Sequence, residues 1–258
     1  MSVSLAEISA YLDERLAIAT TPDYPPALNG VQVGHRGPVT RIAAAVDASM
    51  QTIEMAAEAG ANLLLVHHGL FWNGLRPLTG PHEARIRALF AHDIAVYSAH
   101  PPLDAHETFG NSALLARELG LAVSGGFAKH QHIYCGVRGD AELETEALVA
   151  RVRAWALPLG HHTVSSRIPA GHRTRRWAIC SGSGAQVDTL REAYSTGVDT
   201  LIVGEGPHWS AVEAAEYGLV IVYAGHYATE TLGVRALAAH LASRYDVAWQ
   251  FLHAPTGL

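Results

Sequence analysis

The chain has 258 residues, of which 49% are hydrophobic and 16% are charged, and its formal net charge is −6. This composition excludes a disordered chain, and the acidic net charge argues against general binding to nucleic acid. No apolar run reaches the roughly 20 residues that span a bilayer, and residues 1–19 have the pattern of an amphipathic helix rather than a signal peptide. We therefore predict a cytoplasmic protein without a membrane partner.

Short apolar runs alternate with helical patterns in the first half of the chain. Strands are predicted at residues 42–46, 61–66 and 94–99, and helices at residues 51–59, 81–92 and 111–119. Ser49 suits the N-cap of the first of these helices, and Gly60 suits its end. The order strand, helix, strand with short connections indicates βαβ crossovers and a largely parallel sheet.

The pattern starts again after Ser124-Gly125-Gly126, which indicates a second lobe. Strands are predicted at residues 132–137, 177–180, 200–203, 219–224 and 247–251, and helices at residues 142–156, 187–194, 211–217 and 229–244. The predicted class is α/β, with two lobes of mostly parallel or mixed sheet flanked by helices. Residues 1–124 with 227–258 would form the first lobe, and residues 125–226 the second.

Cysteines and a basic cluster carry little functional signal. Cys135 and Cys180 lie in apolar segments that resemble strands, so buried reduced thiols are expected. A group of basic residues between residues 167 and 176 is read as a solvated loop, with contact to an anionic substrate or a neighbouring subunit as the alternative. The group comprises Arg167, His172, Arg173, Arg175 and Arg176.

Imidazoles and carboxylates recur where predicted strands end, which is the edge of a parallel sheet that binds ligands. The chain has 16 histidines, and position must decide which of them matter. Those that follow strands form four sets: His67 with His68, His100 with Asp104, Glu205 with His208, and His226 with Glu230. Another neighbouring pair, His161 and His162, is read as an exposed pair without a function.

The spacing within each set constrains its geometry. Neighbouring strand residues point to opposite faces, so either the strand breaks at His67-His68 or each histidine serves a different ion. Pro101-Pro102 predicts an extended turn that presents Asp104. His226 and Glu230 are four residues apart at a helix start, so they share one face. Such a mixture suits zinc, iron, manganese, nickel or cobalt, and Asp104 and Glu230 are the natural bridges between two ions.

Two other catalytic classes lack their motifs. The segment Ser181-Gly182-Ser183-Gly184 could bind an anion through its backbone, but it lacks the lysine of a Walker motif and the full dinucleotide fingerprint. No Gly-x-Ser-x-Gly elbow occurs, which argues against a serine hydrolase of the α/β class.

With these motifs in order, the chain resembles the dinuclear metal-centre proteins of the Nif-three-like family, whose members are often named GTP cyclohydrolase I type 2. The resemblance runs from about residue 5 to residue 251 and rests on five stretches: NGVQVG (29–34), VHHGLFW (66–72), SAHPPLD (98–104), GSG (182–184) and AGHYATE (224–230). Gly69, where many members have proline, and residues 108–111 depart from the pattern. The chain is also too short for the middle domain of larger members.

The resemblance implies two similar lobes with a dinuclear metal site between them and a homohexamer built as a trimer of dimers. It implies five metal ligands, which are His67, His68, Asp104, His226 and Glu230. His100 matches a histidine near the metals, and Glu205 matches a pocket-lining position, so both are candidates for proton transfer. No organic cofactor is implied.

Three functional hypotheses follow from the sequence. The first is a metal-dependent hydrolase acting on a nucleotide or phosphate ester, with ring opening of GTP suggested by the family label. The second is a non-catalytic metal-binding protein, a metallochaperone or a scaffold. The third is nucleic-acid binding through the hole of a ring, which the acidic net charge opposes.

Overall fold

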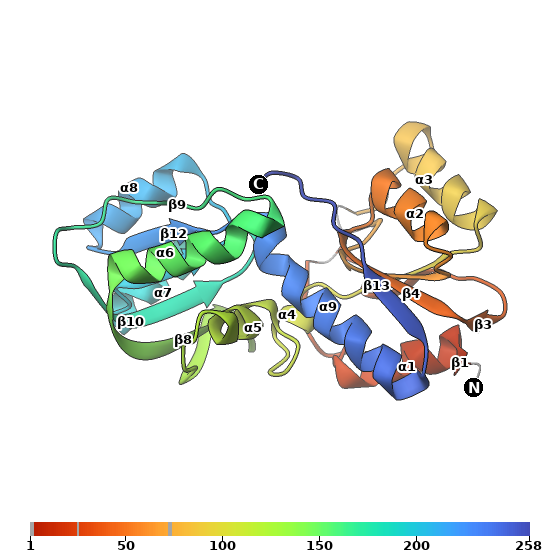
Figure 1. Ribbon diagram of the computed structural model, residues 1–258, viewed down its shortest axis with the longest axis horizontal. Helices are drawn as coiled ribbons and strands as arrows, with labels where there is room; N and C mark the ends of the chain where they lie inside the picture. Colours follow the sequence, from red (N-terminus) through yellow and green to blue (C-terminus); the bar gives the residue numbers. More distant parts are fainter. Residues whose placement is uncertain (1–2, 25, 72–73) are drawn as a thin grey trace. The chain divides into compact units, whose positions relative to one another are not determined.

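The computed structural model describes residues 3–24, 26–71 and 74–258 (Figure 1). The chain divides into two compact units. The first comprises Met1–His106 and Gly233–Ala254, and the second comprises Glu107–Leu232 and Pro255–Leu258. Each unit has its own sheet, so the two are described separately.

The first unit is built on a five-stranded sheet in the order β13-β4-β5-β6-β2. Four of its strands are parallel, and these are β4 (Arg41–Asp47), β5 (Leu63–His68), β6 (Ala95–Ser98) and β13 (Ala248–Phe251). Strand β2 (Gly30–Val33) pairs with β6 in the antiparallel sense. A separate antiparallel pair joins β1 (Val3–Ser4) to β3 (Pro38–Val39).

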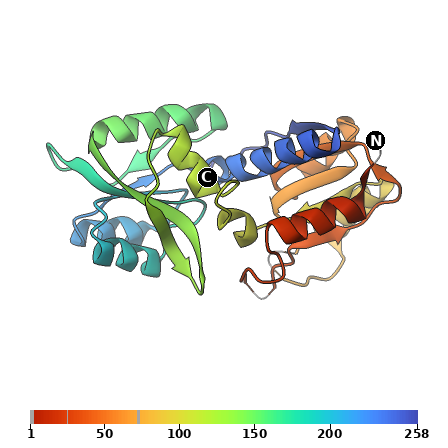
Figure 2. The ribbon, with the colours of Figure 1, turned by 90° about the horizontal axis from the view of Figure 1, so that it is seen from below.

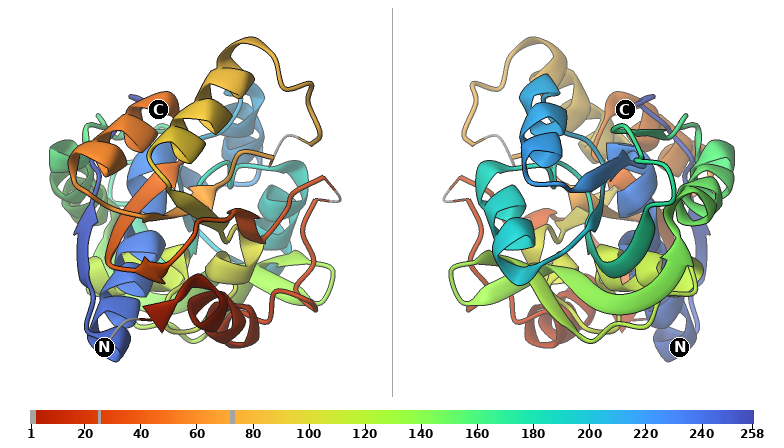
Figure 3. Two further views of the ribbon diagram at one scale, coloured as in Figure 1. Left: turned by 90° about the vertical axis from the view of Figure 1, so that its right-hand side faces the viewer. Right: turned by 90° about the vertical axis from the view of Figure 1, so that its left-hand side faces the viewer.

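Helices cover both faces of this sheet (Figure 3, left). The helices α2 (Met50–Glu58) and α3 (Gly80–Ala91) lie on one face, where Ile53 and Leu89 pack into a core with Leu64. On the opposite face lie α1 (Leu5–Arg15) and the C-terminal part of α9 (His226–Tyr245). Capping boxes at Ser4 and Ser49 begin α1 and α2, because each serine accepts a hydrogen bond from the backbone three residues on. The N-cap predicted at Ser49 is therefore confirmed.

The second unit has a six-stranded mixed sheet in the order β7-β8-β10-β11-β12-β9. Three strands are parallel, and these are β10 (Arg173–Cys180), β11 (Thr200–Val203) and β12 (Val220–Tyr223). The others pair in the antiparallel sense, and these are β7 (Gly125–His130), β8 (Ile133–Glu144) and β9 (Val164–Ser165). Strands β7 and β8 form a hairpin at one edge (Figure 2).

Alternation along β10 shows how this sheet is buried on both faces. Trp177 and Ile179 face a core that includes α5 (Asn111–Glu118) and α6 (Thr145–Ala156). Ala178 and Cys180 face the core under α7 (Val187–Thr196) and α8 (His208–Glu216) (Figure 3, right). A short 3₁₀ turn, η1 (Leu157–Leu159), follows α6. Because side chains alternate along a strand, β10 presents one apolar face to each layer of helices.

The α/β class with two lobes is confirmed, but four local predictions were wrong. Residues 125–130 form strand β7 rather than a connection, and residues 142–144 end strand β8 rather than begin a helix. Pro101-Pro102 opens a one-turn helix, α4 (Pro101–Asp104), because proline is compatible with a first turn whose N–H groups have no helical partner. Three members of the basic cluster lie in β10 rather than in a loop, and these are Arg173, Arg175 and Arg176.

The two units divide the chain differently from the predicted ranges. Helix α5 belongs to the second unit because Leu115 and Ala116 pack in the core around Trp177. The first seven residues of α9, from His226 to Leu232, also belong to that unit. An amphipathic pattern indicates a helix but does not say which sheet it will cover. Within the described residues, no helix is long and apolar enough to cross a membrane.

Candidate metal centre

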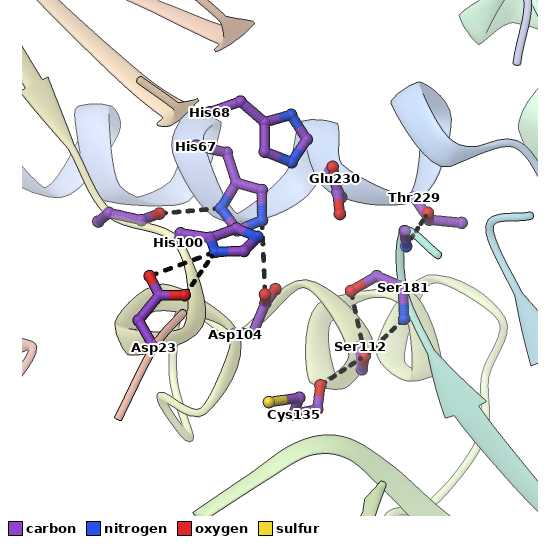
Figure 4. Close-up of polar contacts among 12 residues, drawn as sticks. Asp23, His67, His68, His100, Asp104, Ser112, Cys135, Ser181, Thr229 and Glu230 are labelled. Atoms are coloured by element: carbon purple, nitrogen blue, oxygen red, sulfur yellow. Dashed lines mark hydrogen bonds and ion pairs between the residues drawn. The ribbon is translucent and has the colours of Figure 1, made fainter. Parts of the chain in front are cut away.

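Three histidines come together at the ends of β5 and β6 in the first unit (Figure 4). Strand β5 does not break before His68, which pairs with Asp47 in β4. The rings of His67 and His68 are nevertheless 4.9 Å apart, and that of His100 lies 5.0 Å from the first and 5.5 Å from the second. One ring nitrogen from each residue lies within 4.8 Å of the others, so the three could hold a metal ion.

In each of these three rings, the Nδ1 atom makes a hydrogen bond to an oxygen acceptor. The Nδ1 atom of His67 donates to the carbonyl of Ala99 at 2.8 Å, and that of His68 donates to Asp47 Oδ1 at 2.9 Å. The same atom of His100 donates to Asp23 Oδ1 at 3.1 Å. An acceptor at Nδ1 fixes the tautomer, and it leaves the Nε2 lone pair as the ligand atom. Histidines that bind metals in proteins usually carry this kind of support.

Asp104 joins this group from the last residue of α4. Its Oδ2 atom lies 3.4 Å from Nε2 of His67, which is completely buried. The turn that carries Asp104 is anchored by the backbone N–H of His100, which donates to Asn29 Oδ1 at 2.8 Å. The structure therefore brings His67, His68, His100 and Asp104 together, as predicted for neighbouring strand ends.

Asp23 is a functional candidate that the sequence reasoning missed. Besides the proton of His100, its carboxylate accepts hydrogen bonds from Asn29 Nδ2 at 2.7 Å and from the backbone N–H of Tyr24. Burial alone would raise the pKa of Asp23, but these bonds and the charge of His100 lower it overall. Asp23 lies 77 positions from His100 in a loop without strand or helix pattern, so no local signal could have indicated it.

The second unit supplies a histidine between two glutamates. His226 begins α9, and its Nε2 lies 3.0 Å from Oε2 of Glu230, one helical turn later. Its Nδ1 donates to Oε1 of Glu205 at 2.7 Å, just after β11. Burial would lower the pKa of His226, but Glu230 and then Glu205 outweigh it and raise the pKa to about 9. This environment strongly favours a positive charge.

Glycines let the loop after β10 approach Glu230 closely. Gly182 has a φ of +61°, and a Cβ atom there would overlap Oε1 of Glu230. Its N–H donates to Oγ1 of Thr229 at 3.0 Å, and its carbonyl accepts from the N–H of Glu205 at 2.8 Å. The segment Ser181–Gly184 thus contributes backbone to the second group, and its glycines are needed for space.

Two other histidines named in the sequence analysis are His208 and His161. His208, which the sequence groups with Glu205, begins α8 with an exposed side chain. His161, read as exposed from the sequence, is half-buried, and its Nε2 lies 3.3 Å from the carbonyl of Tyr223. Its ring fills the space that a side chain at Gly225 would need. His161 therefore supports the turn that leads into His226.

The donor set of both groups fits divalent transition metals. It combines imidazole nitrogens with carboxylate oxygens, and each histidine in the two groups has an oxygen acceptor at Nδ1. A cluster of buried imidazoles and carboxylates is costly unless a cation or a proton compensates it.

Comparison with known proteins identifies the family of this chain. The family model described as Duf34/NIF3 (NGG1p interacting factor 3) matches residues 3–256. The chain belongs to the Duf34/NIF3 family. A relative from Deinococcus radiodurans, named GTP cyclohydrolase 1 type 2 homolog, is 43% identical over 98% of this chain and 94% of its own length. A relative of the same name from Halobacterium salinarum is 42% identical over 99% of this chain and all of its own.

Solved structures share the fold of this Duf34/NIF3 protein over its full length. A crystal structure from Thermus thermophilus is 36% identical and has a TM-score of 0.88, with 100% of both chains covered. The protein ybgI, solved as a protein of unknown function, is 32% identical and has a TM-score of 0.89 over 100% of both chains. The family and the two-lobe fold expected from the sequence motifs are thereby confirmed. Trp72, at the end of one of those motifs, lies outside the described residues.

Proposed function

We propose that this Duf34/NIF3 protein binds two divalent metal ions and uses them for hydrolysis. His67, His68 and Asp104 of the first unit and His226 and Glu230 of the second would supply the ligands. The observation that carries the proposal is that imidazoles and carboxylates come together and that each imidazole, including that of His100, has Nδ1 on an oxygen acceptor. This support serves a metal ligand, because it orients the ring and raises the basicity of Nε2.

Hydrolysis is the chemistry that such a pair of ions supplies, since bound metal lowers the pKa of water and polarises the bond under attack. His100 is held by Asp23 through Nδ1 and lies beside the proposed ligands, so we assign it to proton transfer. Glu205 already accepts from His226, and we assign it to positioning that ring. Proton transfer by Glu205, the other role that the sequence allows, would use the carboxylate oxygen that is not bonded to His226.

A nucleotide or phosphate ester is the proposed substrate class. The relatives' name refers to a GTP cyclohydrolase, and a glycine loop follows the carboxyl end of β10. The non-catalytic alternative, a metallochaperone or scaffold, requires the same ligands but no turnover. It is distinguished by the absence of product from any nucleotide or phosphate ester tested with metal-loaded protein.

Metal content is the first test. Protein purified without added metal or a chelating tag would be analysed by elemental analysis beside Asp104→Ala and Glu230→Ala. His162→Ala is the matched control, because this histidine is exposed and outside both groups. We expect about two transition-metal ions per chain in wild type and control, and a loss in both ligand variants. Protein that contains no metal and takes none up under anaerobic reconstitution would contradict the proposal.

We also propose that the protein forms the homohexamer implied by the resemblance. Light scattering coupled to size-exclusion chromatography should give six times the chain mass of 27.5 kDa. A mass of one or two chains at micromolar concentration would reject it without affecting the metal ligands.

A further inference from the structure

Two arginines and a histidine interact around the first turns of α3 in the first unit. This cluster consists of Arg76, His82 and Arg85. Arg85 Nη1 donates to the carbonyl of Ala48 at 3.0 Å, and the N–H of Ala48 donates to the carbonyl of His68 at 2.9 Å. One residue therefore separates the guanidinium from a proposed metal ligand.

His82 contributes a buried donor to this cluster. The side chain is 5% exposed and packs edge-on against Phe71, with ring centroids 5.7 Å apart. Its Nδ1 lies 3.5 Å from Nη2 of Arg85, and a guanidinium can only donate, so the proton of the neutral imidazole resides on Nε2. Within the described part of the chain, Nε2 is buried without a hydrogen-bond partner. A buried N–H in this position requires an acceptor.

No carboxylate compensates Arg85 among the described residues. Glu83, on the same helix, is bonded instead to Arg87 at 2.7 Å. Burial and then the charge of Arg76 lower the pKa of Arg85, and burial followed by the charges of Arg85 and Arg76 lowers that of His82. The two arginines thus repel each other and disfavour a positive charge on His82, and an anion among the three groups would relieve that repulsion.

We propose that Arg76, His82 and Arg85 bind a phosphate group of the substrate. A phosphate oxygen matches the fork of a guanidinium and can accept from Nε2 of His82. The assignment rests on the proposed function, because it makes the substrate of the metal centre a phosphorylated compound. It places the phosphate near Ala48, whose N–H donates to the carbonyl of His68.

Phosphate binding to the protein as purified tests this assignment. Inorganic phosphate, a nucleoside triphosphate and the matching nucleoside would be titrated by calorimetry into wild type, Arg85→Gln and Arg76→Gln. Arg87→Gln is the control, since this arginine lies on the same helix and pairs with Glu83. We expect both cluster variants to weaken binding of phosphate and triphosphate about tenfold or more, and binding of the nucleoside to stay unchanged. Arg87→Gln should match wild type.

Asp104→Ala separates this proposal from the proposed metal function. Phosphate binding that survives in Arg85→Gln and Arg76→Gln but disappears in Asp104→Ala would place the phosphate on metal and overturn the cluster assignment. Arginine-dependent phosphate binding in wild-type protein that contains no metal and takes none up under anaerobic reconstitution would sustain the cluster and reject the metal centre. Equal binding by all variants, or none by wild type, overturns the assignment as well. Thermal unfolding identifies a variant that fails to fold, in which case exposed Arg76 carries the test.

Discussion

Glu205 accepts the Nδ1 proton of His226 at 2.7 Å, while Glu230 faces the other ring nitrogen at 3.0 Å. The two glutamates therefore have different roles toward one imidazole. Glu230 is on the side that would face a metal ion, and Glu205 supports the ring from behind. Their exposures agree with this division, because the side chain of Glu230 is 5% exposed and that of Glu205 is 41% exposed.

Glu205→Gln should weaken metal binding without abolishing it. Glutamine keeps an acceptor for Nδ1 but removes the charge, and loss of such outer support typically costs about 10- to 100-fold in metal affinity. Competition against a chromophoric chelator would measure the change, with Glu213→Gln on α8 as the control. An unchanged affinity would mean that Glu205 does not act through His226.

The metal-free protein should lose stability as the pH rises from neutral toward 9. The pKa of His226 is raised from 6.5 to about 9, so folding favours the protonated ring. This contribution is fully present below about pH 6.5 and is lost as the pH rises through about 9. Urea unfolding of chelator-treated protein at several pH values would show the loss, and Glu205→Gln should reduce it. Stability that rises over this range would contradict the raised pKa.

Local patterns predicted the elements that carry long apolar runs, and they failed where distant residues decide the structure. Strand β7 has only Phe127 fully buried and begins with two glycines, so it resembles a turn until β8 pairs with it. The end of β8 carries Glu142 and Glu144, whose partner Arg173 lies on β10. Charges at such spacing also fit a helix, and the strand is favoured by pairing with the distant strand β10, both through the backbone and through these ion pairs.

The same distinction holds for the candidate site. Strand ends indicated His67, His68 and His226, because apolar runs deliver these residues to the sheet edge. Asp23 contacts His100 from a loop, and Arg85 contacts Ala48 from a helix. Their positions in the sequence do not indicate these contacts. Asp23 is revealed by its contact with Nδ1 of His100 in the folded chain.

Asp23→Asn should disturb His100 more than it disturbs the fold. The amide can still hold the loop through Asn29, but it removes the carboxylate charge of Asp23, whose pKa is lowered, from beside the Nδ1 proton of His100. Any hydrolysis of a phosphate ester should therefore fall in kcat, with a shifted pH profile and little change in KM. Asp23→Ala leaves the N–H groups without an acceptor and should cost about 1–3 kcal/mol of unfolding free energy. If the pH profile of Asp23→Asn is identical to that of wild type, Asp23 has only a structural role.

Gly182→Ala should release metal from the protein through a clash rather than through loss of a ligand. The new Cβ would overlap Oε1 of Glu230 and come within 3.3 Å of His226 Nε2, so the carboxylate would have to move. Backbone strain at a positive φ would add about 1–2 kcal/mol of destabilisation. Gly171→Ala controls for that strain, because Gly171 has a φ of +72° and open space around its Cβ position. We expect both variants to unfold at lower urea concentration, but only Gly182→Ala to lose metal by elemental analysis. Metal retained in both would show that Glu230 is not held against the glycine loop in the metal-bound protein.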